Sequence, residues 1–209
     1  MIKYIQKRQV SKMNKTQIMD SILEKNNQYF LTSQAIDNGI SKTYVAEYIK
    51  KNGLVKLAHG VYSTEDAWPD LLYVIHLRNK EVVFSHESAL AIHGLSVREA
   101  PGISITVNRS YNATHLRKEG CRVYTVKPEL YDMGITNGKT FYGNTVRVYD
   151  IDRTICDIIK HKKKIDIQTY QYAIKEYMKS SKKNINNLMK YANALGVENT
   201  VRLYTEVML

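Results

Sequence analysis

The stretch over residues 32–49 constrains the fold more than any other part of this 209-residue chain. Two short helices that cross tightly need a small residue at the crossing, and Ala35 supplies one. Gly39, four residues later, tolerates the positive φ of a tight turn. An apolar stripe at helical spacing follows, formed by Val45, Tyr48 and Ile49. The pattern predicts a helix-turn-helix with helices over 33–38 and 42–52.

The flanking residues extend this motif into a small domain. An amphipathic helix is expected over 13–26, and residues 54–63 alternate around Ala58-His59-Gly60 as a β-hairpin. The side chains suited to cap the three helices are Asn14, Thr32 and Ser41. Because the hairpin directly follows the helix-turn-helix, the sequence predicts a winged helix-turn-helix over residues 1–68.

The apolar stripe leaves the opposite helix face free for a ligand. The start of a recognition helix meets base edges of double-stranded DNA, whereas its end and the wing commonly contact phosphates. The outward candidates are Lys42, Thr43, Tyr44, Glu47, Lys50 and Lys51 on the helix, with Lys56 and His59 on or near the wing. We predict that Lys42, Thr43 and Tyr44 read bases and that Lys50, Lys51 and Lys56 mainly hold phosphates. A helical bundle with solvated lysines, or a protein-binding helix-turn-helix, would give the same pattern.

The charge of the chain favours phosphate-rich partners. Its net charge is +11, and basic residues exceed acidic ones most strongly near the two ends. Lysines of the basic, mainly helical C-terminal tail could extend a DNA footprint or form a solvated face. These are Lys160, Lys162, Lys163, Lys164, Lys182 and Lys183.

The remainder, 69–209, is predicted to form a second domain after a polar link over 64–70. Short strands are expected near residues 82–84, 103–107 and 122–126, with a hairpin over 140–149 that turns on Gly143-Asn144. Helices are expected over 69–79, 85–93, 153–161, 166–179, 184–195 and 197–208. The fold class is therefore α+β: a winged helix-turn-helix followed by a mixed α/β C-terminal domain with a helical tail.

Candidate catalytic groups in this second domain do not form a known signature. Asp150, Asp152 and Asp157 cluster near Arg153, but a restriction-type nuclease also needs an acidic-x-Lys triplet, which the chain lacks. Asp152 is instead suited to cap the 153–161 helix. No Gly-rich nucleotide loop, kinase motif or nucleophile elbow is present. We therefore expect no catalytic residue, no cofactor and no enzymatic activity.

Metal binding and membrane insertion are not indicated either. His86 and His93 could share a helical face, but two histidines without a third ligand make a poor metal site. Cys121 and Cys156 lie far apart without metal-ligand spacing, so each is expected to be a reduced thiol. No apolar run reaches the length of a membrane helix, and residues 1–13 lack the apolar core of a signal peptide. We expect a cytoplasmic protein.

Two segments carry a family resemblance. They are SHESALAIHGL at residues 85–95 and DRTICDI at residues 152–158, set after the expected winged helix and strands. In this order the chain resembles the AbiEi family, the antitoxins of type IV toxin–antitoxin and abortive-infection systems that confer phage resistance. The likeness covers nearly the whole chain.

The resemblance implies a divided function. The winged helix would repress its own operon by binding inverted repeats in the promoter, and the C-terminal domain would counter a nucleotidyltransferase-like toxin without a stable complex. Some relatives are proposed to phosphorylate their toxin, an activity not carried over here because no kinase motif is present. The alternatives are a plain winged-helix transcriptional regulator with a sensory C-terminal domain, or an enzyme, either a degenerate nuclease or a toxin-modifying kinase.

Overall fold

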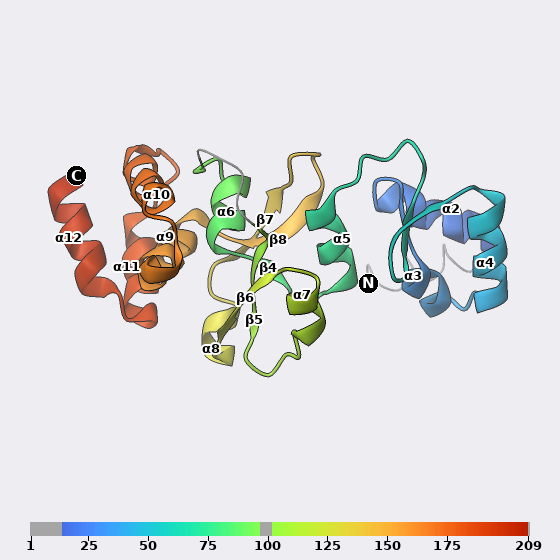
Figure 1. Ribbon diagram of the computed structural model, residues 1–209, viewed down its shortest axis with the longest axis horizontal. Coiled ribbons are helices and arrows are strands. Elements are labelled where there is room, and N and C mark those ends of the chain that lie inside the picture. The colour runs from blue at the N-terminus through green and yellow to red at the C-terminus, as the bar shows by residue number, and fades with distance from the viewer. Residues whose placement is uncertain (1–13, 97–101, 209) are drawn as a thin grey trace, which may run out of the picture. The chain divides into compact units, whose positions relative to one another are not determined.

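The chain folds into two compact units with mixed α and β structure. The computed structural model describes residues 14–96 and 102–208, and its units comprise Met1–Arg78 and Asn79–Leu209. Each unit has its own sheet, of three strands in the first and five in the second (Figure 1). Within the described ranges, every helix is too short or too polar to cross a bilayer.

The described part of the first unit places four helices beside a small antiparallel sheet with strand order β1-β3-β2. Strand β1 was not expected from the sequence, and it pairs Phe30 with Tyr62. Lys56 pairs with Tyr62 on the other side of β3, and a bulge follows it in β2. The elements are α2 (Lys15–Lys25), β1 (Tyr29–Leu31), α3 (Thr32–Asp37), α4 (Lys42–Lys51), β2 (Val55–Ala58), β3 (Val61–Ser63) and α5 (Leu71–Arg78).

The core of the first unit follows the expected stripe. Ala35 is completely buried, consistent with a close helix crossing at that position. Gly39 has φ +81°, as the turn requires. Phe30 and Tyr48 pack with ring centroids 5.4 Å apart, which ties β1 to α4. The other buried members are Met19, Ile22, Ile40, Val45 and Leu54.

Two of the three expected caps are confirmed. Asn14 and Gln17 form a reciprocal capping box at α2, and the Ser41 hydroxyl accepts a hydrogen bond from the Tyr44 N–H. Thr32 is not an N-cap, because Leu31 occupies that position. The Thr32 N–H instead donates to the Gly60 carbonyl at 3.0 Å. This bond extends the pairing of β1 with β3 to the first residue of α3.

Helix α5 belongs to the first unit. The Tyr73 ring packs edge-on against Tyr29, with centroids 5.0 Å apart. The Tyr29 hydroxyl donates to the Trp68 carbonyl at 2.6 Å and accepts from the Asp70 N–H at 3.0 Å. These contacts carry the unit through Arg78, beyond the boundary expected between residues 68 and 69.

The second unit is built on a mixed five-stranded sheet of order β6-β5-β4-β8-β7. Strands β4 and β8 are parallel, as are β5 and β6, while β4–β5 and β7–β8 are antiparallel. Its strands are β4 (Val83–Phe84), β5 (Ser104–Asn108), β6 (Arg122–Val126), β7 (Ile135–Lys139) and β8 (Thr145–Tyr149). Its helices are α6 (His86–Ile92), α7 (Thr114–Lys118), α8 (Pro128–Tyr131), α9 (Ile151–Lys160), the 3-10 helix η1 (Lys162–Lys164), α10 (Ile167–Lys179), α11 (Ile185–Leu195) and α12 (Glu198–Met208).

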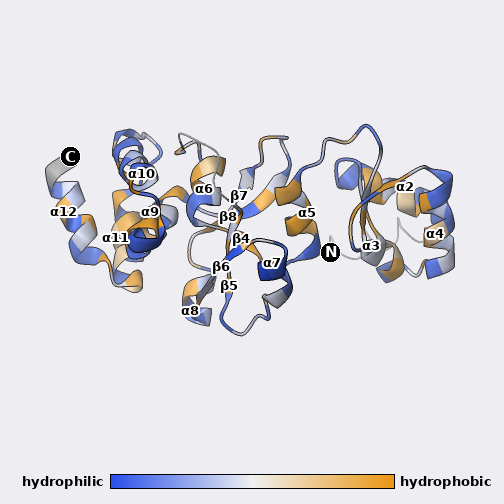
Figure 2. Ribbon diagram, viewed as in Figure 1, coloured by the Kyte–Doolittle hydropathy of each residue, from blue (hydrophilic) through white to orange (hydrophobic). Residues whose placement is uncertain are grey.

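A helical core adjoins this sheet. Helices α6 and α9 directly follow the parallel strands β4 and β8 and pack against each other. Helix α9 also packs on α10 and α11, around the fully buried side chains of Ile155, Tyr177 and Leu188. Hydrophobic residues alternate with hydrophilic ones along α9 and α11 (Figure 2), as expected for helices that bury one face.

The β7–β8 hairpin lies earlier in the sequence than expected. Strand β7 ends at Lys139, and the predicted strand over 140–142 is part of the connecting loop. Phe141 in this loop is 96% exposed, so this aromatic stretch is not part of a buried strand. A Cβ on Gly138 would lie 2.5 Å from Ile92 Cγ2, so β7 passes α6 too closely for a larger residue. Helices α7 and α8 were not expected.

Candidate functional site

Helix α4 presents the residues that the sequence singled out, and nearly all of them are accessible. Val45 and Tyr48 are buried on its inner face, with 4% and 5% exposure. The predicted helix residues exposed on the outer face are Lys42, Thr43, Glu47, Lys50 and Lys51. Ser41 fixes the start of the helix, so Lys42 and Thr43 belong to its first turn.

Tyr44 faces outward only in part. It is half-buried, and its hydroxyl lies 3.2 Å from the Thr16 hydroxyl of α2. The Lys15 ammonium lies 5.3 Å from the centre of the Tyr44 ring. Tyr44 therefore packs α4 against the start of α2 and adds Lys15 and Thr16 to the surface beside the expected recognition residues. Sequence reasoning missed these two residues because they belong to a different helix.

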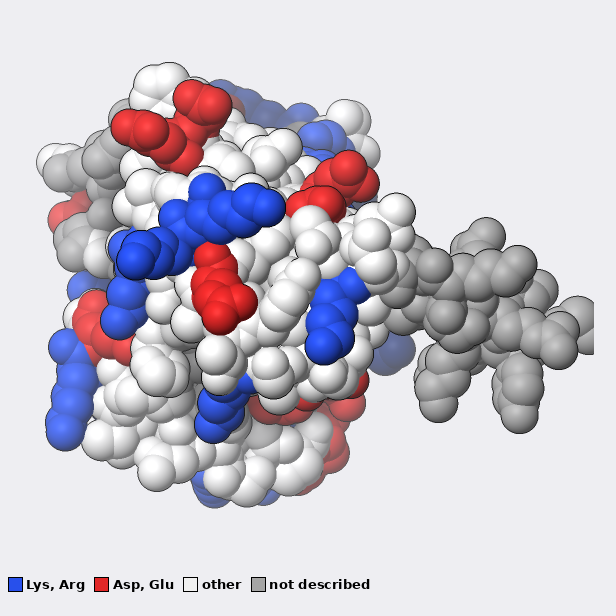
Figure 3. Space-filling model, turned by 90° about the vertical axis from the view of Figure 1, so that its right-hand side faces the viewer, with Lys and Arg blue, Asp and Glu red and all other residues white. Residues whose placement is uncertain are grey.

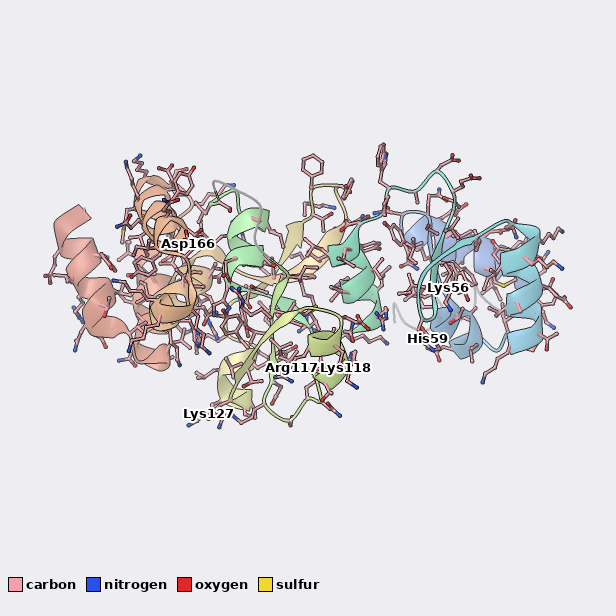
Figure 4. The ribbon with its side chains drawn as sticks, viewed as in Figure 1. Lys56, His59, Arg117, Lys118, Lys127 and Asp166 are labelled. Carbon is pink, nitrogen blue, oxygen red and sulfur yellow. The ribbon has the colours of Figure 1, made fainter. Side chains whose placement is uncertain are left out.

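The β2–β3 hairpin holds the remaining two predicted residues. Lys56 and His59 are both exposed, and both come from this hairpin (Figure 4). Gly60 has φ +74°, and a Cβ there would lie 3.1 Å from the Thr32 hydroxyl oxygen. The turn of the hairpin therefore lies close to the start of α3, and this contact fixes the backbone position of the neighbouring His59.

The outer surface of the first unit carries mixed charge. Lys50 and Lys51 lie in the last turn of α4, where cations interact favourably with the helix dipole. Glu47 lies one turn earlier, between these lysines and Lys42. Figure 3 shows basic side chains interspersed with acidic ones over the face it turns to the viewer. Such a surface can select where an anion binds, because the carboxylate opposes phosphates that approach in the wrong register.

A second group of polar residues lies inside the second unit, where α6 begins. His86 is 1% exposed and has φ +50°, a left-handed conformation that is uncommon outside glycine. Its ring stacks on Tyr124 of β6 with centroids 3.5 Å apart, and its Nε2 lies 3.0 Å from Nδ1 of His161. We call His86, Tyr124, His161 and their hydrogen-bonded neighbours the imidazole cluster.

Hydroxyl groups continue the imidazole cluster into the sheet. Nδ1 of His86 lies 2.9 Å from the Ser85 hydroxyl, which accepts a hydrogen bond from Thr106 at 2.8 Å. At the outer end, Nδ1 of His161 also lies 3.1 Å from the Asp157 carbonyl oxygen. Burial, together with neighbouring positive groups, lowers the pKa of His86 well below its usual value and that of His161 less strongly. Both rings are therefore neutral at pH 7.

Two ion pairs flank the imidazole cluster. The buried Glu87 carboxylate binds Arg122, whose side chain is 43% exposed, and also accepts from the Ser104 hydroxyl. Arg153 is fully buried and donates from Nε to Asp157 at 3.2 Å. Burial raises the pKa of Asp157 to about 6, although Arg153 opposes that shift.

The acidic residues near Arg153 serve structural roles. Asp150, not Asp152 as expected, caps α9 by accepting from the Arg153 N–H. Asp152 instead accepts from the Tyr177 hydroxyl at 2.7 Å and from the Asn184 N–H at 2.9 Å. The described residues hold no group of three or more His, Cys, Asp or Glu side chains arranged to bind a metal.

His93 and the cysteines take no part in the imidazole cluster. His93 follows the last turn of α6 and contacts the Tyr149 carbonyl at 2.7 Å, so it does not share a site with His86. Cys121 and Cys156 are buried and not disulfide-bonded, as expected, and burial raises the pKa of Cys156. In the sequence, Ser85-His86-Glu87 stands out as part of a family-like segment, and His86 also as one of two histidines that could share a helical face. Its contacts with Tyr124 and His161 depend on the sheet order.

Comparison with known proteins gives a fold relationship. No family model matches the chain, and no match is found among curated proteins. A solved structure with a similar fold is "Crystal structure of RV2827C protein from Mycobacterium tuberculosis", with a TM-score of 0.53 and 11% sequence identity. The similarity covers 78% of this chain, which spans 64% of the length of that protein. At this identity the likeness establishes the fold alone.

Proposed function

We propose that the first unit is a winged helix-turn-helix that binds double-stranded DNA. The observation that carries this proposal is the division of α4 into a face buried in a three-helix core and an exposed face bearing Lys42, Thr43 and Lys50. A hairpin with exposed Lys56 follows directly, at the position of a wing. A helix anchored in this way can enter the major groove while the hairpin reaches the backbone.

The exposed residues have different roles in this proposal. Lys42 and Thr43 lie in the first turn and read base edges, together with the exposed part of Tyr44. Lys50, Lys51 and Lys56 contact phosphates, whereas His59 lies at the edge of the footprint. Glu47 discriminates against a misplaced backbone or accepts from a cytosine amino group.

The family resemblance extends the proposal to the whole chain. We propose an antitoxin of a type IV system that represses its own operon through inverted promoter repeats and counters a nucleotidyltransferase-like toxin without forming a stable complex. The chain is +11 overall, which suits a partner rich in phosphate. In this proposal the first unit supplies repression and the second supplies neutralisation.

Titration of the full chain onto its own promoter fragment at several salt concentrations tests DNA binding. We expect log K to fall with log salt by roughly 0.9 per phosphate neutralised, and a scrambled fragment to bind more weakly. Equal affinity for both fragments, or affinity independent of salt, would refute the proposal.

Single substitutions on α4 test the division of roles. Lys42→Ala should relax sequence preference, with a loss of roughly 1–3 kcal/mol if Lys42 makes a bidentate base contact. Lys50→Ala should weaken binding to all DNA sequences by a similar factor and reduce the slope of log K against log salt. Lys25→Ala is the matched control, because this exposed lysine ends α2 and lies outside α4 and the hairpin. If Lys42→Ala leaves the preference intact, the register of α4 on DNA is different.

Co-expression with the product of a neighbouring nucleotidyltransferase-like gene tests the antitoxin role. The chain should relieve toxicity, and Lys50→Ala should still do so while losing repression. Failure to rescue would favour a transcriptional regulator with a sensory second unit. Mass measurement of the toxin after incubation with this chain, ATP and Mg²⁺ distinguishes a toxin-modifying enzyme, since a phosphoryl group would add mass.

A further inference from the structure

The geometry points to a phosphate-binding site at the outer edge of the imidazole cluster, formed by Arg122, His161 and Lys164 around Tyr124. The ligand class is a phosphate dianion, either free or as the monoester group of a nucleotide. This inference concerns the second unit and is independent of DNA binding by the first.

Tyr124 is the centre of this site. His86 stacks on its ring at 3.5 Å, the His161 ring centroid lies 5.0 Å away, and the Lys164 ammonium lies 5.9 Å from the ring centre. Arg122 lies two residues earlier on the same strand, and therefore on the same face of the sheet. The three basic residues are therefore all placed around Tyr124.

Two buried donors in this region lack an acceptor among the described residues. The Tyr124 hydroxyl has none for its proton although Tyr124 is only 6% exposed, and Arg153 Nη2 has none although Arg153 is fully buried. Buried polar groups are nearly always paired, so each orphan indicates a missing acceptor. Arg122 lies close to the Tyr124 hydroxyl and is 43% exposed.

The charges around the imidazole rings favour an anion. The cationic groups that face His86 and His161 are Arg122 from β6, Arg153 and Lys160 from α9, and Lys164 from η1. The carboxylates in this region are Glu87 from α6 and Asp157 from α9, which pair with Arg122 and Arg153. Lys160 and Lys164 therefore remain in excess, beside two imidazoles that cannot both be protonated. A bound dianion would offset this repulsion.

The backbone of His86 supports a functional reason for the imidazole. A non-glycine residue in the left-handed region is strained, and such strain persists where the surrounding structure imposes it, often at ligand sites. The strained turn places the ring between Ser85 and His161. A buried apolar side chain in a relaxed turn would fill the same space without forming this chain of hydrogen bonds.

The chain Thr106–Ser85–His86–His161 sets the protonation of the outer imidazole. The Asp157 carbonyl oxygen lies 3.1 Å from Nδ1 of His161 and can only accept, so it favours a proton on that nitrogen. In the neutral ring Nε2 is then an acceptor, and it becomes a donor to a phosphate dianion when the ring takes up a second proton.

Binding of inorganic phosphate to the full chain, followed by calorimetry and by imidazole ¹⁵N resonances, tests the site. Phosphate should raise the titration midpoint of His161 by about one pH unit relative to chloride at equal ionic strength. Lys164→Ala should weaken binding about tenfold, as expected for loss of one charge-assisted contact. Lys163→Ala is the matched control from the same 3-10 helix and should bind as the parent does.

Tyr124→Phe separates ligand binding from folding. The substitution keeps the stack on His86 and removes a hydroxyl whose proton has no acceptor among the described residues, so stability should be little changed while phosphate affinity falls. A nucleoside monophosphate that binds more tightly than inorganic phosphate would identify a nucleotide as the source, whereas equal affinity would indicate free phosphate. The proposal is overturned if neither ligand moves the His161 resonances, if Tyr124→Phe and Lys164→Ala bind normally, or if Lys163→Ala weakens binding equally.

Discussion

Replacement of Asp152 by alanine should loosen the helical tail of the second unit. One carboxylate oxygen, Oδ1, accepts from the Tyr177 hydroxyl at 2.7 Å and from the Asn184 N–H at 2.9 Å. It therefore joins α9 to α10 and to the start of α11. Asp152 is 4% exposed and Tyr177 is fully buried, so water cannot easily replace either contact.

The expected magnitude follows from these two bonds. A hydrogen bond to a charged group contributes about 1.5–3 kcal/mol, so Asp152→Ala should cost about 3–5 kcal/mol. Tyr177→Phe removes one bond and should cost about half as much. Asp152→Ala alone leaves the Tyr177 hydroxyl without its acceptor, whereas the double variant Asp152→Ala/Tyr177→Phe has no such hydroxyl. Its cost should therefore fall below the sum of the single costs by about 1 kcal/mol or more.

Amide hydrogen exchange of peptides from α10 and α11 measures the free energy of local opening of these helices, and Asp152→Ala should lower it. The fluorescence of Trp68, the single tryptophan, reports the first unit and should not change. Asp152→Asn is the conservative control, because its amide oxygen can still accept both bonds. The reasoning is refuted if Asp152→Ala leaves exchange in α10 and α11 unchanged, or if Tyr177→Phe costs as much as Asp152→Ala.

Three further predictions concern the second unit. Gly138→Ala should lower stability by about 1–3 kcal/mol in urea unfolding, because its Cβ would meet Ile92 at 2.5 Å. The pKa of Asp157 is raised by burial from 3.8 to about 6, so the folded state binds its proton more tightly than the unfolded state. The contribution of this carboxyl group to stability should therefore decrease as the pH rises from about 4 to about 6, and Asp157→Asn should remove that decrease when the free energy of unfolding is measured against pH. A fragment of residues 79–209 should show a cooperative thermal transition, whereas 70–209 should gain solvent-exposed apolar surface, detectable by dye binding, because Tyr73 loses its partner Tyr29.

The helices of the first unit could be predicted because local signals agree there. Ala35, Gly39 and the Val45–Tyr48 stripe each specify the same crossing, and the structure places all of them as expected. Strand β1 could not be predicted in this way. It has three residues, all buried, so it shows no alternation of apolar and polar positions.

The β7–β8 hairpin shows where propensity misleads. The stretch over 140–142 has aromatic residues that favour strands, whereas Ile135–Lys139 contains Asn and Gly, which strands disfavour. The strand nevertheless forms over Ile135–Lys139. Gly138, which has no side chain, lets the backbone of β7 lie close to the side chains of Ile92 and Val148. Tertiary packing therefore decides the register, and no local pattern contains that information.

The two candidate sites differ in the same respect. The exposed residues of α4 lie on one helix and one hairpin, so their spacing in the sequence already places them near one another. The imidazole cluster joins His86, Tyr124 and His161, which come together only because β6 is placed two strands from β4 and α9 packs on α6. Its chemistry also depends on a left-handed His86, which sequence periodicity does not indicate. Sites assembled across a sheet thus require the strand order before their residues can be recognised, even when one segment, here Ser85–Glu87, already stands out in the sequence.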